Sequence, residues 1–462
     1  MSTKSDASSK AHPLAAIILA AGLGTRMKSA TPKVLHTVAG RPLLGHMVMT
    51  LKALQPSRLV VVVGRAQEQV AAYASGLDAA IAVQDPPKGT GHAAACARTA
   101  LEGFAGDVLV LYGDNPLLTP ATLEKLRAAK TKETALVLMG FRPHDPGPYG
   151  RLILNEEGGL EAIIEARDAS DAQRRIGFCN AGGFLLDAGL LFDLLGGLSS
   201  DNAQGEYYLT DIVKGARARG LSCAAIEAPA DDVMGVNNRA ELADVERIYQ
   251  ARRRREAMLA GVTLADPDTV YFSADTILGE DVTVGQNVVF GPAVRVANTV
   301  TIKPFCHLEG VVVEEGAIIG PFARLRPGSV IGANAHIGNF VETKNARIGE
   351  GAKANHLTYL GDATVGAGAN IGAGTITCNY DGFEKFKTEI GAGAFIGSNS
   401  ALVAPVAIGD GAYVGAGSVI TKDVSADSLA VERATQKEVD QWAARFRTRK
   451  RQEKAARQKE GK

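Results

Sequence analysis

Residues 390–420 read IGAGAFIGSNSALVAPVAIGDGAYVGAGSVI, and the regular pattern of this stretch indicates how the C-terminal half folds. An aliphatic residue, often followed by glycine, returns at every sixth position: Ile390, Ile396, Leu402, Ile408, Val414 and Ile420. A period of six matches neither the 3.6-residue turn of an α-helix nor the two-residue alternation of a hairpin. It is typical of a solenoid of short strands and turns, with each aliphatic side chain pointing inward.

The same period extends upstream, with phase breaks, at Leu278, Val284, Phe290, Val296, Ile302, Leu308, Ile319, Leu325, Ile331, Ile337, Ile348, Ala354, Leu360, Val365 and Ile371. We therefore predict a parallel β-helix. Residues 378–389 interrupt the pattern, and a packed solenoid interior has no room for them. They are expected to loop outward, and loops on rigid scaffolds often carry function.

The N-terminal half has a different texture. Apolar runs at 15–19, 59–63, 108–111 and 135–139 alternate with helical stretches, which predicts an α/β, doubly wound, Rossmann-like sheet. The first three runs are continuous, as in parallel strands covered on both faces. Lys4 and Lys10 before the run 14–21 loosely resemble a signal peptide. Because that run leads directly into a glycine-rich loop, we favour a strand.

Composition excludes several classes of protein. The 462 residues are enough for two or three domains, and 50 basic residues balance 50 acidic ones. No net basic field draws the chain to nucleic acid or to a membrane surface. Its five cysteines form no C-x-x-C pair, which argues against zinc ribbons and a disulfide framework and favours the cytoplasm. No apolar run approaches the roughly 18 residues of a membrane span.

Three further segments flank or connect these halves. Residues 1–12 are polar and predicted to be disordered, and 238–260 read as one exposed helical connector. The arginine run 252–255 fits a solvated helix face better than a phosphate or nucleic-acid site. The basic tail 436–462, with the single tryptophan Trp442, is expected to be partly helical or disordered. Nucleic-acid binding by this tail is the less favoured alternative.

The loop after the first strand, Gly22-Leu-Gly24-Thr-Arg26-Met27, is a candidate phosphate site. Glycines let backbone N–H groups approach phosphate oxygens, and the N-terminus of a following helix would add its dipole. Neither a Walker motif nor a full G-x-G-x-x-G is present. Arg26 and Lys33 supply cations that suit a triphosphate with a pyrophosphate leaving group. The alternative is a tight turn with exposed charges.

Two other residues are chemical candidates. Asp114 ends the apolar run 109–112, and the carboxyl ends of parallel strands are where α/β sheets bind ligands. A single carboxylate there suits Mg²⁺, although it could instead cap a helix before Pro116. His356 lies among polar residues that the solenoid itself does not need. It is the natural general base, or else a surface turn residue.

The motifs 19–27, Pro32-Lys33, Gly89-Thr-Gly-His92 and Tyr112-Gly-Asp114 resemble those of sugar-phosphate nucleotidyltransferases. Joined to hexapeptide repeats, residues 14–435 resemble the bacterial bifunctional N-acetylglucosamine-1-phosphate uridyltransferase/glucosamine-1-phosphate acetyltransferase family. The resemblance implies a uridyltransferase domain at 13–237, a linker at 238–260 and a left-handed β-helix acetyltransferase domain at 261–435. It also implies a cytoplasmic homotrimer that makes UDP-N-acetylglucosamine for cell-wall and lipopolysaccharide precursors, without nucleic-acid or membrane partners.

The resemblance assigns roles in the first half. Arg26 and Lys33 would be catalytic, and Asp114 and Asn237 would hold Mg²⁺. Gln84, Gly89 and Thr90 would contact uracil, whereas Gly150, Glu165 and Asn180 would bind N-acetylglucosamine. The remaining contacts to UTP and the UDP-sugar would come from Leu19, Ala20, Ala21, Gly22, Gly24, Tyr112 and Gly113.

In the second half, the resemblance makes His356 the base that deprotonates the amine of glucosamine-1-phosphate, which then attacks acetyl-CoA, and makes Glu342 the group that orients it. The sugar phosphate would be held by Arg326, Lys344, Tyr359, Asn370 and Lys385. Acetyl-CoA would be held by Ala373, Asn379, Tyr380, Ser398, Ala416 and Arg433. Cys378 beside the inserted loop has no activating partner, and covalent catalysis through it is disfavoured.

Two rival hypotheses stay open on the sequence. The chain could be a nucleotidyltransferase whose β-helix only trimerises it, although the His356 cluster and the 378–389 insertion speak against this. It could also be a non-catalytic binder of sugar nucleotides, against which Arg26, Lys33, Asp114 and Asn237 speak.

Overall fold

The computed structural model describes residues 12–202 and 204–460, so most of the predicted N-terminal extension lies outside the described residues. The chain divides into two compact units. Unit 1 comprises residues up to Ala260 together with Asp266–Thr276 and Phe290–Ala293, and unit 2 holds the rest. All five cysteines are free thiols. Within the described ranges no helix is both long and apolar enough to cross a membrane.

Unit 1 is built on a mostly parallel sheet in the order β11-β7-β10-β6-β1-β4-β5. Its strands are β1 (Leu14–Leu19), β4 (Arg58–Gly64), β5 (Ala80–Gln84), β6 (Asp107–Tyr112), β7 (Thr134–Phe141), β10 (Cys179–Asp187) and β11 (Ser222–Glu227). The run that loosely resembled a signal peptide is β1, a fully buried strand between β4 and β6. Two small elements, β2 (Thr37–Val38) and β3 (Arg41–Pro42), pair separately.

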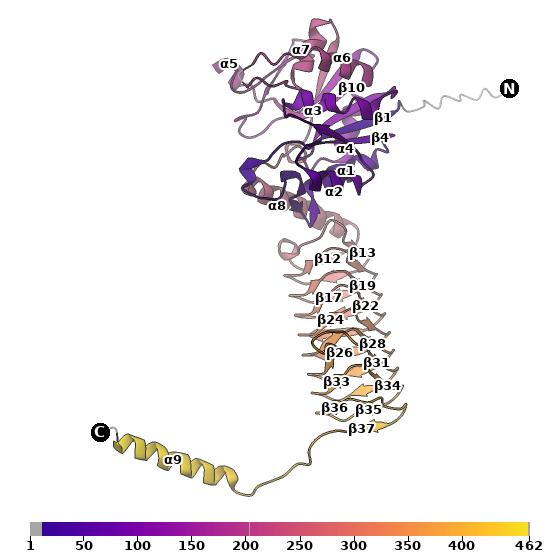
Figure 1. Cartoon of the computed structure of the whole chain (residues 1–462), viewed down its shortest axis with the longest axis vertical. Helices are drawn as coiled ribbons and strands as arrows, with labels where there is room; N and C mark the ends of the chain where they lie inside the picture. Colours follow the sequence, from indigo (N-terminus) through magenta and orange to yellow (C-terminus); the bar gives the residue numbers. More distant parts are fainter. Residues whose placement is uncertain (1–11, 203, 461–462) are drawn as a thin grey trace, which may run out of the picture. The chain divides into compact units, whose positions relative to one another are not determined.

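Helices cover both faces of this sheet, which confirms the doubly wound prediction (Figure 1). Ala15, Ile17 and Leu19 of β1 pack with one helical layer, and Ala16 and Ile18 pack with the other, as strand alternation requires. The first layer holds α3 (Thr90–Cys96), α6 (Ala188–Gly196) and α7 (Asp211–Ala218). The second holds α1 (Leu43–Ala53), α2 (Glu68–Ser75) and α4 (Pro120–Ala128).

One strand departs from the simple alternating pattern. β10 runs antiparallel to both β6 and β7, with register shifts between Asn180 and Phe184. The strands β8 (Arg151–Leu154) and β9 (Leu160–Ile164) form a hairpin joined to β10 at Cys179. Helix α5 (Asp171–Arg174) begins in a capping box at Ser170. This insertion brings Asn180 and Glu165 to one side of the sheet.

The connector helix is α8 (Arg239–Leu259), and it is less exposed than expected. Its arginines are engaged within unit 1: Arg252 pairs with Asp232 at 2.9 Å, and Arg254 is only 8% exposed. Arg253 donates to the Thr276 carbonyl and to Glu256. The predicted solvated arginine face is therefore wrong for these three residues, because the helix packs against the sheet unit and a returning loop.

Unit 2 is a parallel β-helix of stacked coils with three sheets (Figure 1). The first sheet contains β12 (Thr263–Leu264), β14 (Thr283–Val284), β17 (Thr301–Ile302), β20 (Ile318–Ile319), β23 (His336–Asn339), β26 (Lys353–His356), β29 (Asn370–Ile371), β32 (Phe395–Ile396), β35 (Tyr413–Val414) and β37 (Leu429–Ala430). The second contains β13 (Ile277–Leu278), β16 (Arg295–Val296), β19 (Val311–Val313), β22 (Ser329–Ile331), β25 (Arg347–Ile348), β28 (Ala363–Val365), β31 (Thr388–Ile390) and β34 (Val406–Ile408). The third contains β15 (Val289–Phe290), β18 (His307–Leu308), β21 (Arg324–Leu325), β24 (Glu342–Lys344), β27 (Tyr359–Gly361), β30 (Ile376–Cys378), β33 (Ala401–Val403) and β36 (Val419–Ile420).

The six-residue period places each aliphatic residue over its counterpart in the next coil. Ile319 lies in register with Ile302 on one side and Ile337 on the other, and all three are buried. Every residue of the predicted series is buried except Leu278 at the first coil. The 378–389 insertion loops outward as predicted, since Phe383 is 93% exposed. The basic tail contains the helix α9 (Trp442–Glu460).

Candidate functional sites

The phosphate-loop candidate follows β1 directly. Gly24 has φ +60°, a left-handed conformation that favours glycine. The loop then enters a single 3₁₀ turn, η1 (Thr25–Met27), whose Met27 is buried against Val236 and the α8 residue Val245. The expected contribution of a helix dipole is therefore wrong here, because three residues form no macrodipole. What the loop offers is backbone N–H groups and the Arg26 side chain, held in place by the buried Met27.

Four predicted residues converge beyond this loop. The Lys33 ammonium contacts the Asp114 carboxylate, and its Nζ lies 3.5 Å from Asn237 Oδ1. Arg26 Nη2 donates to the same Asn237 oxygen at 2.9 Å. The Val236 N–H donates to the Asp114 carbonyl at 3.0 Å, which fixes the segment before α8 against the end of β6. Residues far apart in sequence thus form one polar cluster.

The alternative role for Asp114, a helix cap, is wrong. Helix α4 begins at Pro120, and its N-cap is Thr119, whose side chain accepts from the Thr122 N–H. The carboxylate of Asp114 instead pairs with the Lys33 ammonium. A carboxylate oxygen and an amide oxygen side by side are the hard donors that Mg²⁺ takes, with phosphates and water completing its shell. Asp114 and Asn237 fit that ion by the chemistry of their donors.

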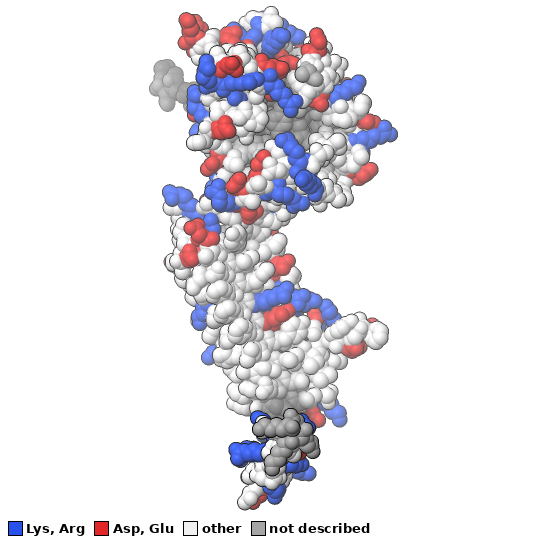
Figure 2. Space-filling model, turned by 90° about the vertical axis from the view of Figure 1, so that its left-hand side faces the viewer, with Lys and Arg blue, Asp and Glu red and all other residues white. Residues whose placement is uncertain are grey.

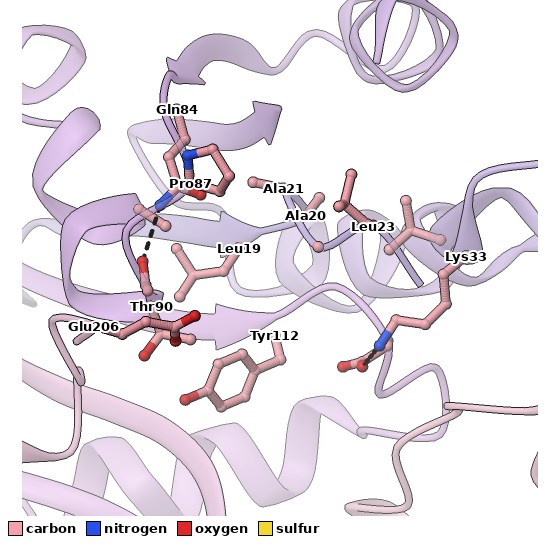
Figure 3. A pocket seen from close by; sticks show the side chains of 15 residues that line it. Leu19, Ala20, Ala21, Leu23, Lys33, Gln84, Pro87, Thr90, Tyr112 and Glu206 are labelled. Atoms are coloured by element: carbon pink, nitrogen blue, oxygen red, sulfur yellow. Dashed lines mark hydrogen bonds and ion pairs between the residues drawn. The ribbon is translucent and has the colours of Figure 1, made fainter. Parts of the chain in front are cut away.

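A cavity of about 290 Å³ opens next to this cluster (Figure 3). It is lined by ten of the sixteen residues predicted to bind the nucleotide or UDP-sugar: Leu19, Ala20, Ala21, Gly22, Lys33, Gln84, Gly89, Thr90, Tyr112 and Asp114. Gly24 lies against Lys33, and the Gly113 N–H donates to the Leu19 carbonyl, so both support the rim. Glu206 also lines the cavity and had no sequence signal.

A second cavity of about 410 Å³ shares Thr90, Tyr112 and Glu206 with the first. It holds the predicted sugar residues Glu165 and Asn180, and Gly150 lies beside it because its carbonyl accepts from the Asn180 N–H at 2.8 Å. Sequence reasoning missed several further lining residues, among them the polar side chains Gln204, Tyr208 and Thr210. They come from an irregular segment whose position only the fold defines.

The pKa values of two ionisable groups that line these cavities are shifted from their ordinary values. Burial raises the pKa of the Tyr112 phenol, and the carboxylates of Glu165 and Asp114 raise it further. Burial raises the pKa of Glu165, and the nearby Asp168 adds to that effect. The Tyr112 phenol therefore stays neutral and can donate a hydrogen bond to a polar ligand.

In the β-helix, His356 ends β26 and is exposed. Its Nδ1 lies 2.7 Å from Oδ1 of Asn339, which occupies the matching position at the end of β23. Glu342, expected to orient His356, instead accepts from Arg326 Nη1 at 2.7 Å. Asn339 is thus a residue that sequence reasoning missed, although the regular coil length would have placed it in register with His356.

Three cationic side chains, Lys344, Lys385 and Arg326, lie close to one another on the β-helix. Lys344 of β24 lies against Lys385 of the inserted loop, and Arg326 is close enough to act on it electrostatically. The Lys385 side chain beside it lowers the pKa of Lys344, through a direct contact first and charge repulsion second. Asp362 partly balances this charge, and it accepts from Asn379 Nδ2 at 2.5 Å and Asn345 Nδ2 at 2.6 Å. Figure 2 shows one face of the β-helix, which is mostly uncharged and carries a group of Lys and Arg next to acidic residues about halfway along, with a few scattered charges elsewhere.

Four of the predicted acetyl-CoA residues follow one another along successive coils: Ala373, Ser398, Ala416 and Arg433. The Ala373 carbonyl accepts from the Asn399 N–H, the Ser398 carbonyl accepts from the Gly417 N–H, and the Ala416 carbonyl accepts from Arg433 Nη1. Asn370 lies in register with Lys353 of the His356 strand, and Tyr359 lies in register with Glu342. Tyr380 is exposed in the inserted loop, where it pairs with Lys385.

Comparisons with known proteins agree with both halves. Residues 16–176 match the MobA-like NTP transferase domain, and residues 310–345 and 387–422 match the bacterial transferase hexapeptide (six repeats). The bifunctional protein GlmU of Paramagnetospirillum magneticum is 55% identical over 444 residues, which is 96% of this chain and 98% of that protein. The GlmU of Azorhizobium caulinodans is 56% identical over 436 residues, covering 94% of this chain and 97% of that one.

A nucleotide-binding α/β unit followed by a hexapeptide β-helix defines a two-part transferase, with one reaction class in each part. The chain belongs to the GlmU family of bifunctional proteins. It is an enzyme of UDP-N-acetylglucosamine synthesis, with uridyltransferase and acetyltransferase activities.

Proposed function

We propose that the chain first acetylates glucosamine-1-phosphate with acetyl-CoA and then transfers uridylyl from UTP to N-acetylglucosamine-1-phosphate, releasing pyrophosphate. Residues 13–237 carry the second reaction and 261–435 the first. The observation that carries this proposal is the convergence of Arg26, Lys33, Asp114 and Asn237 beside one cavity, together with a paired histidine in the β-helix.

In the uridyl-transfer site, Lys33 and Arg26 neutralise the phosphates of UTP and stabilise the charge that develops on pyrophosphate. Asp114 and Asn237 would hold Mg²⁺, which would add charge neutralisation at these phosphates. The sugar phosphate oxygen attacks the α-phosphorus in line, so the protein needs to position and neutralise rather than to act as a nucleophile.

The sugar lies in the second cavity. Its N-acetyl and hydroxyl groups meet the side chains of Glu165 and Asn180 and the Gly150 backbone. The shared wall of Tyr112 and Thr90 supports a sugar phosphate bound next to the nucleotide.

In the acetyl-transfer site, Asn339 Oδ1 accepts from His356 Nδ1–H and leaves the lone pair on Nε2. Nε2 takes a proton from the amine as its nitrogen attacks the thioester carbonyl; a C–N bond forms, the C–S bond breaks, and the thiolate leaves to be protonated. The phosphate is bound by Arg326, Lys344 and Lys385. Acetyl-CoA lies along Ala373, Ser398, Ala416 and Arg433.

The assembly is a homotrimer through the β-helix. Phe305, Phe322 and Phe340 stack on successive coils, with ring centroids 4.9 and 5.2 Å apart, and they are 48, 45 and 56% exposed. Leu357, next to His356, extends this column and is 61% exposed. An exposed apolar column of this kind supports a second copy as its cover. The cytoplasm, where UTP and acetyl-CoA are available, is the proposed compartment.

The experiment uses purified full-length chain with glucosamine-1-phosphate, acetyl-CoA, UTP and Mg²⁺, each omitted in turn. Free thiol and pyrophosphate are followed separately. We expect thiol release without UTP and pyrophosphate release that requires acetyl-CoA. Pyrophosphate release from unacetylated sugar phosphate at an equal rate would contradict the proposed order.

A further inference from the structure

The amide of Gln84 is held in one orientation at the end of β5. Its Nε2 donates to the Gly89 carbonyl at 2.9 Å and contacts His92 Nδ1 at 3.2 Å. A backbone carbonyl can only accept, so the NH₂ group must point toward Gly89 and the amide oxygen must point away from it. Figure 3 shows the Gln84 side chain beside Pro87 on the cavity wall, with the Gly89 hydrogen bond dashed.

The carbonyl that sets this orientation is itself fixed. Gly89 has φ +96°, and a Cβ there would meet the Tyr207 carbonyl oxygen at 2.6 Å, so only glycine fits. The Tyr207 N–H donates to the Lys88 carbonyl at 2.9 Å, and the Tyr207 carbonyl accepts from the Gly91 N–H at 2.8 Å. The Leu209 N–H donates to Thr90 Oγ1 at 3.0 Å. Segment 207–209 therefore clamps the Gly89 loop on both sides.

His92 supplies the second acceptor, on the first turn of α3. With Gln84 donating to its Nδ1, the ring must carry its proton on Nε2, and that atom lies 4.0 Å from the Cys96 sulfur. Burial first, and the Lys88 charge second, lower the pKa of His92 below its ordinary value. The ring is therefore neutral at pH 7, the state in which Nδ1 accepts.

Gln84 Oε1 is left without a partner by this arrangement. Among residues 12–202 and 204–460 no donor contacts it, while Gln84 lines the nucleotide cavity. An acceptor at this position attracts a base with an N–H donor on its pairing edge, as uracil has at N3. Cytosine presents an acceptor at N3, and the amide cannot turn its NH₂ to meet it without losing Gly89 and His92.

We propose that His92, through Gln84, is a specificity-determining positioning residue that makes the enzyme select UTP over CTP. The proposal rests on the proposed nucleotide site and adds to it the reason why the amide cannot adapt to cytosine. His92 does not touch the base; it removes the alternative amide orientation, so discrimination comes from a fixed side chain rather than from an extra contact.

The test compares His92→Leu with His92→Asn in the full chain. Asparagine places an acceptor oxygen where Nδ1 lies, and leucine has nearly the same shape without it. The readout is the ratio of kcat/KM for UTP to that for CTP, with N-acetylglucosamine-1-phosphate as the second substrate. Acetyl transfer by the same preparations reports that the protein is folded.

We expect His92→Leu to lower the UTP/CTP ratio of kcat/KM about fivefold, as the loss of one neutral hydrogen bond implies. His92→Asn should keep the wild-type ratio. If kcat/KM falls equally for UTP and CTP, or if the two variants have the same UTP/CTP ratio, His92 has a merely structural role and the inference is overturned. Gln84→Ala tests the proposed nucleotide site separately from the role of His92. If that variant also leaves the ratio unchanged, the base does not lie at Gln84 and the proposed nucleotide site itself fails.

Discussion

Nδ1 of His356 lies 2.7 Å from Oδ1 of Asn339, one coil earlier in the same sheet of the β-helix. This contact defines which ring nitrogen carries the proton and leaves Nε2 as the basic atom. The β-helix thereby holds the proposed base at the end of strand β26 rather than on a loop, and the two residues can be tested separately.

Replacing His356 with alanine is expected to lower kcat for acetyl transfer by about 10²- to 10⁴-fold, the range for a general base. Uridyl transfer from pre-acetylated sugar phosphate should be unaffected, because all residues proposed for it lie in unit 1. Thiol release and pyrophosphate release measured on one preparation check this. Unchanged thiol release would leave the β-helix as a scaffold.

Asn339→Ala is expected to lower kcat for acetyl transfer about tenfold and to change its pH profile, since the ring loses its orienting acceptor. Glu342→Ala should instead raise KM for the sugar phosphate, because Glu342 contacts Arg326 rather than His356. Steady-state kinetics against pH distinguish the two. A larger kcat effect at Glu342 would assign the orienting role to that carboxylate.

Asp114→Asn keeps the shape of the side chain but removes the charge that Lys33 contacts. We expect uridyl transfer to fall about 10²- to 10³-fold, in line with the loss of one electrostatic stabiliser, and its Mg²⁺ requirement to rise. Pyrophosphate release titrated with Mg²⁺ measures both, and acetyl transfer serves as the folding control. Wild-type activity in this variant would remove Asp114 from the site.

Lys344→Ala is expected to raise KM for glucosamine-1-phosphate about 10- to 100-fold, as for hydrogen bonds to a charged group, and to relieve the repulsion from Lys385. The effect should shrink as ionic strength rises. The matched control is Lys422→Ala, an exposed lysine outside the proposed site. Equal KM values for the two variants would contradict phosphate binding at Lys344.

Phe322→Glu places a charge in the middle of the stacked column and is expected to shift the proposed trimer to monomers. Acetyl transfer should fall with assembly, whereas uridyl transfer should persist. Sedimentation velocity together with both assays measures this. A variant that remains trimeric would move the interface to another face of the β-helix.

Protonation of His46 limits stability in acid. Burial lowers its pKa from 6.5 to about 4, and its Nε2 lies 2.9 Å from the Val38 carbonyl in the folded state. As pH falls, His46 is protonated in the unfolded chain before it is protonated in the folded one. The stability that neutral His46 contributes is therefore complete above its unfolded pKa and is lost as pH falls toward 4. The free energy of unfolding should drop by about 2 kcal/mol between about pH 7.5 and about pH 5.

This drop is measured as the shift, with pH, of the urea concentration that halves uridyl-transfer activity. The wild type is compared with His46→Gln, which keeps a donor for the Val38 carbonyl but has no titrating ring. The difference between the two proteins isolates His46 from other carboxyls and histidines. Parallel pH curves for both would show that His46 is not the group responsible.

Much of the fold could be predicted because local periodicity encodes it. The inward series from Val284 to Ile420 is buried throughout, since a six-residue side of a β-helix repeats the same environment at every coil. The antiparallel β10 and the β8–β9 hairpin could not be predicted. Their pairing depends on contacts between distant segments rather than on any local pattern.

For the sites, residue type and spacing singled out the candidates: the glycine loop, the cations Arg26 and Lys33, the carboxylate Asp114 and the histidine His356. Which of these side chains meet depends on how the folded chain brings distant segments together. Asn237 joins Asp114 because a backbone hydrogen bond holds the α8 entry against β6. Asn339, not Glu342, meets His356 within the chain, because strand register sets side-chain neighbours and register is a property of the assembled coil.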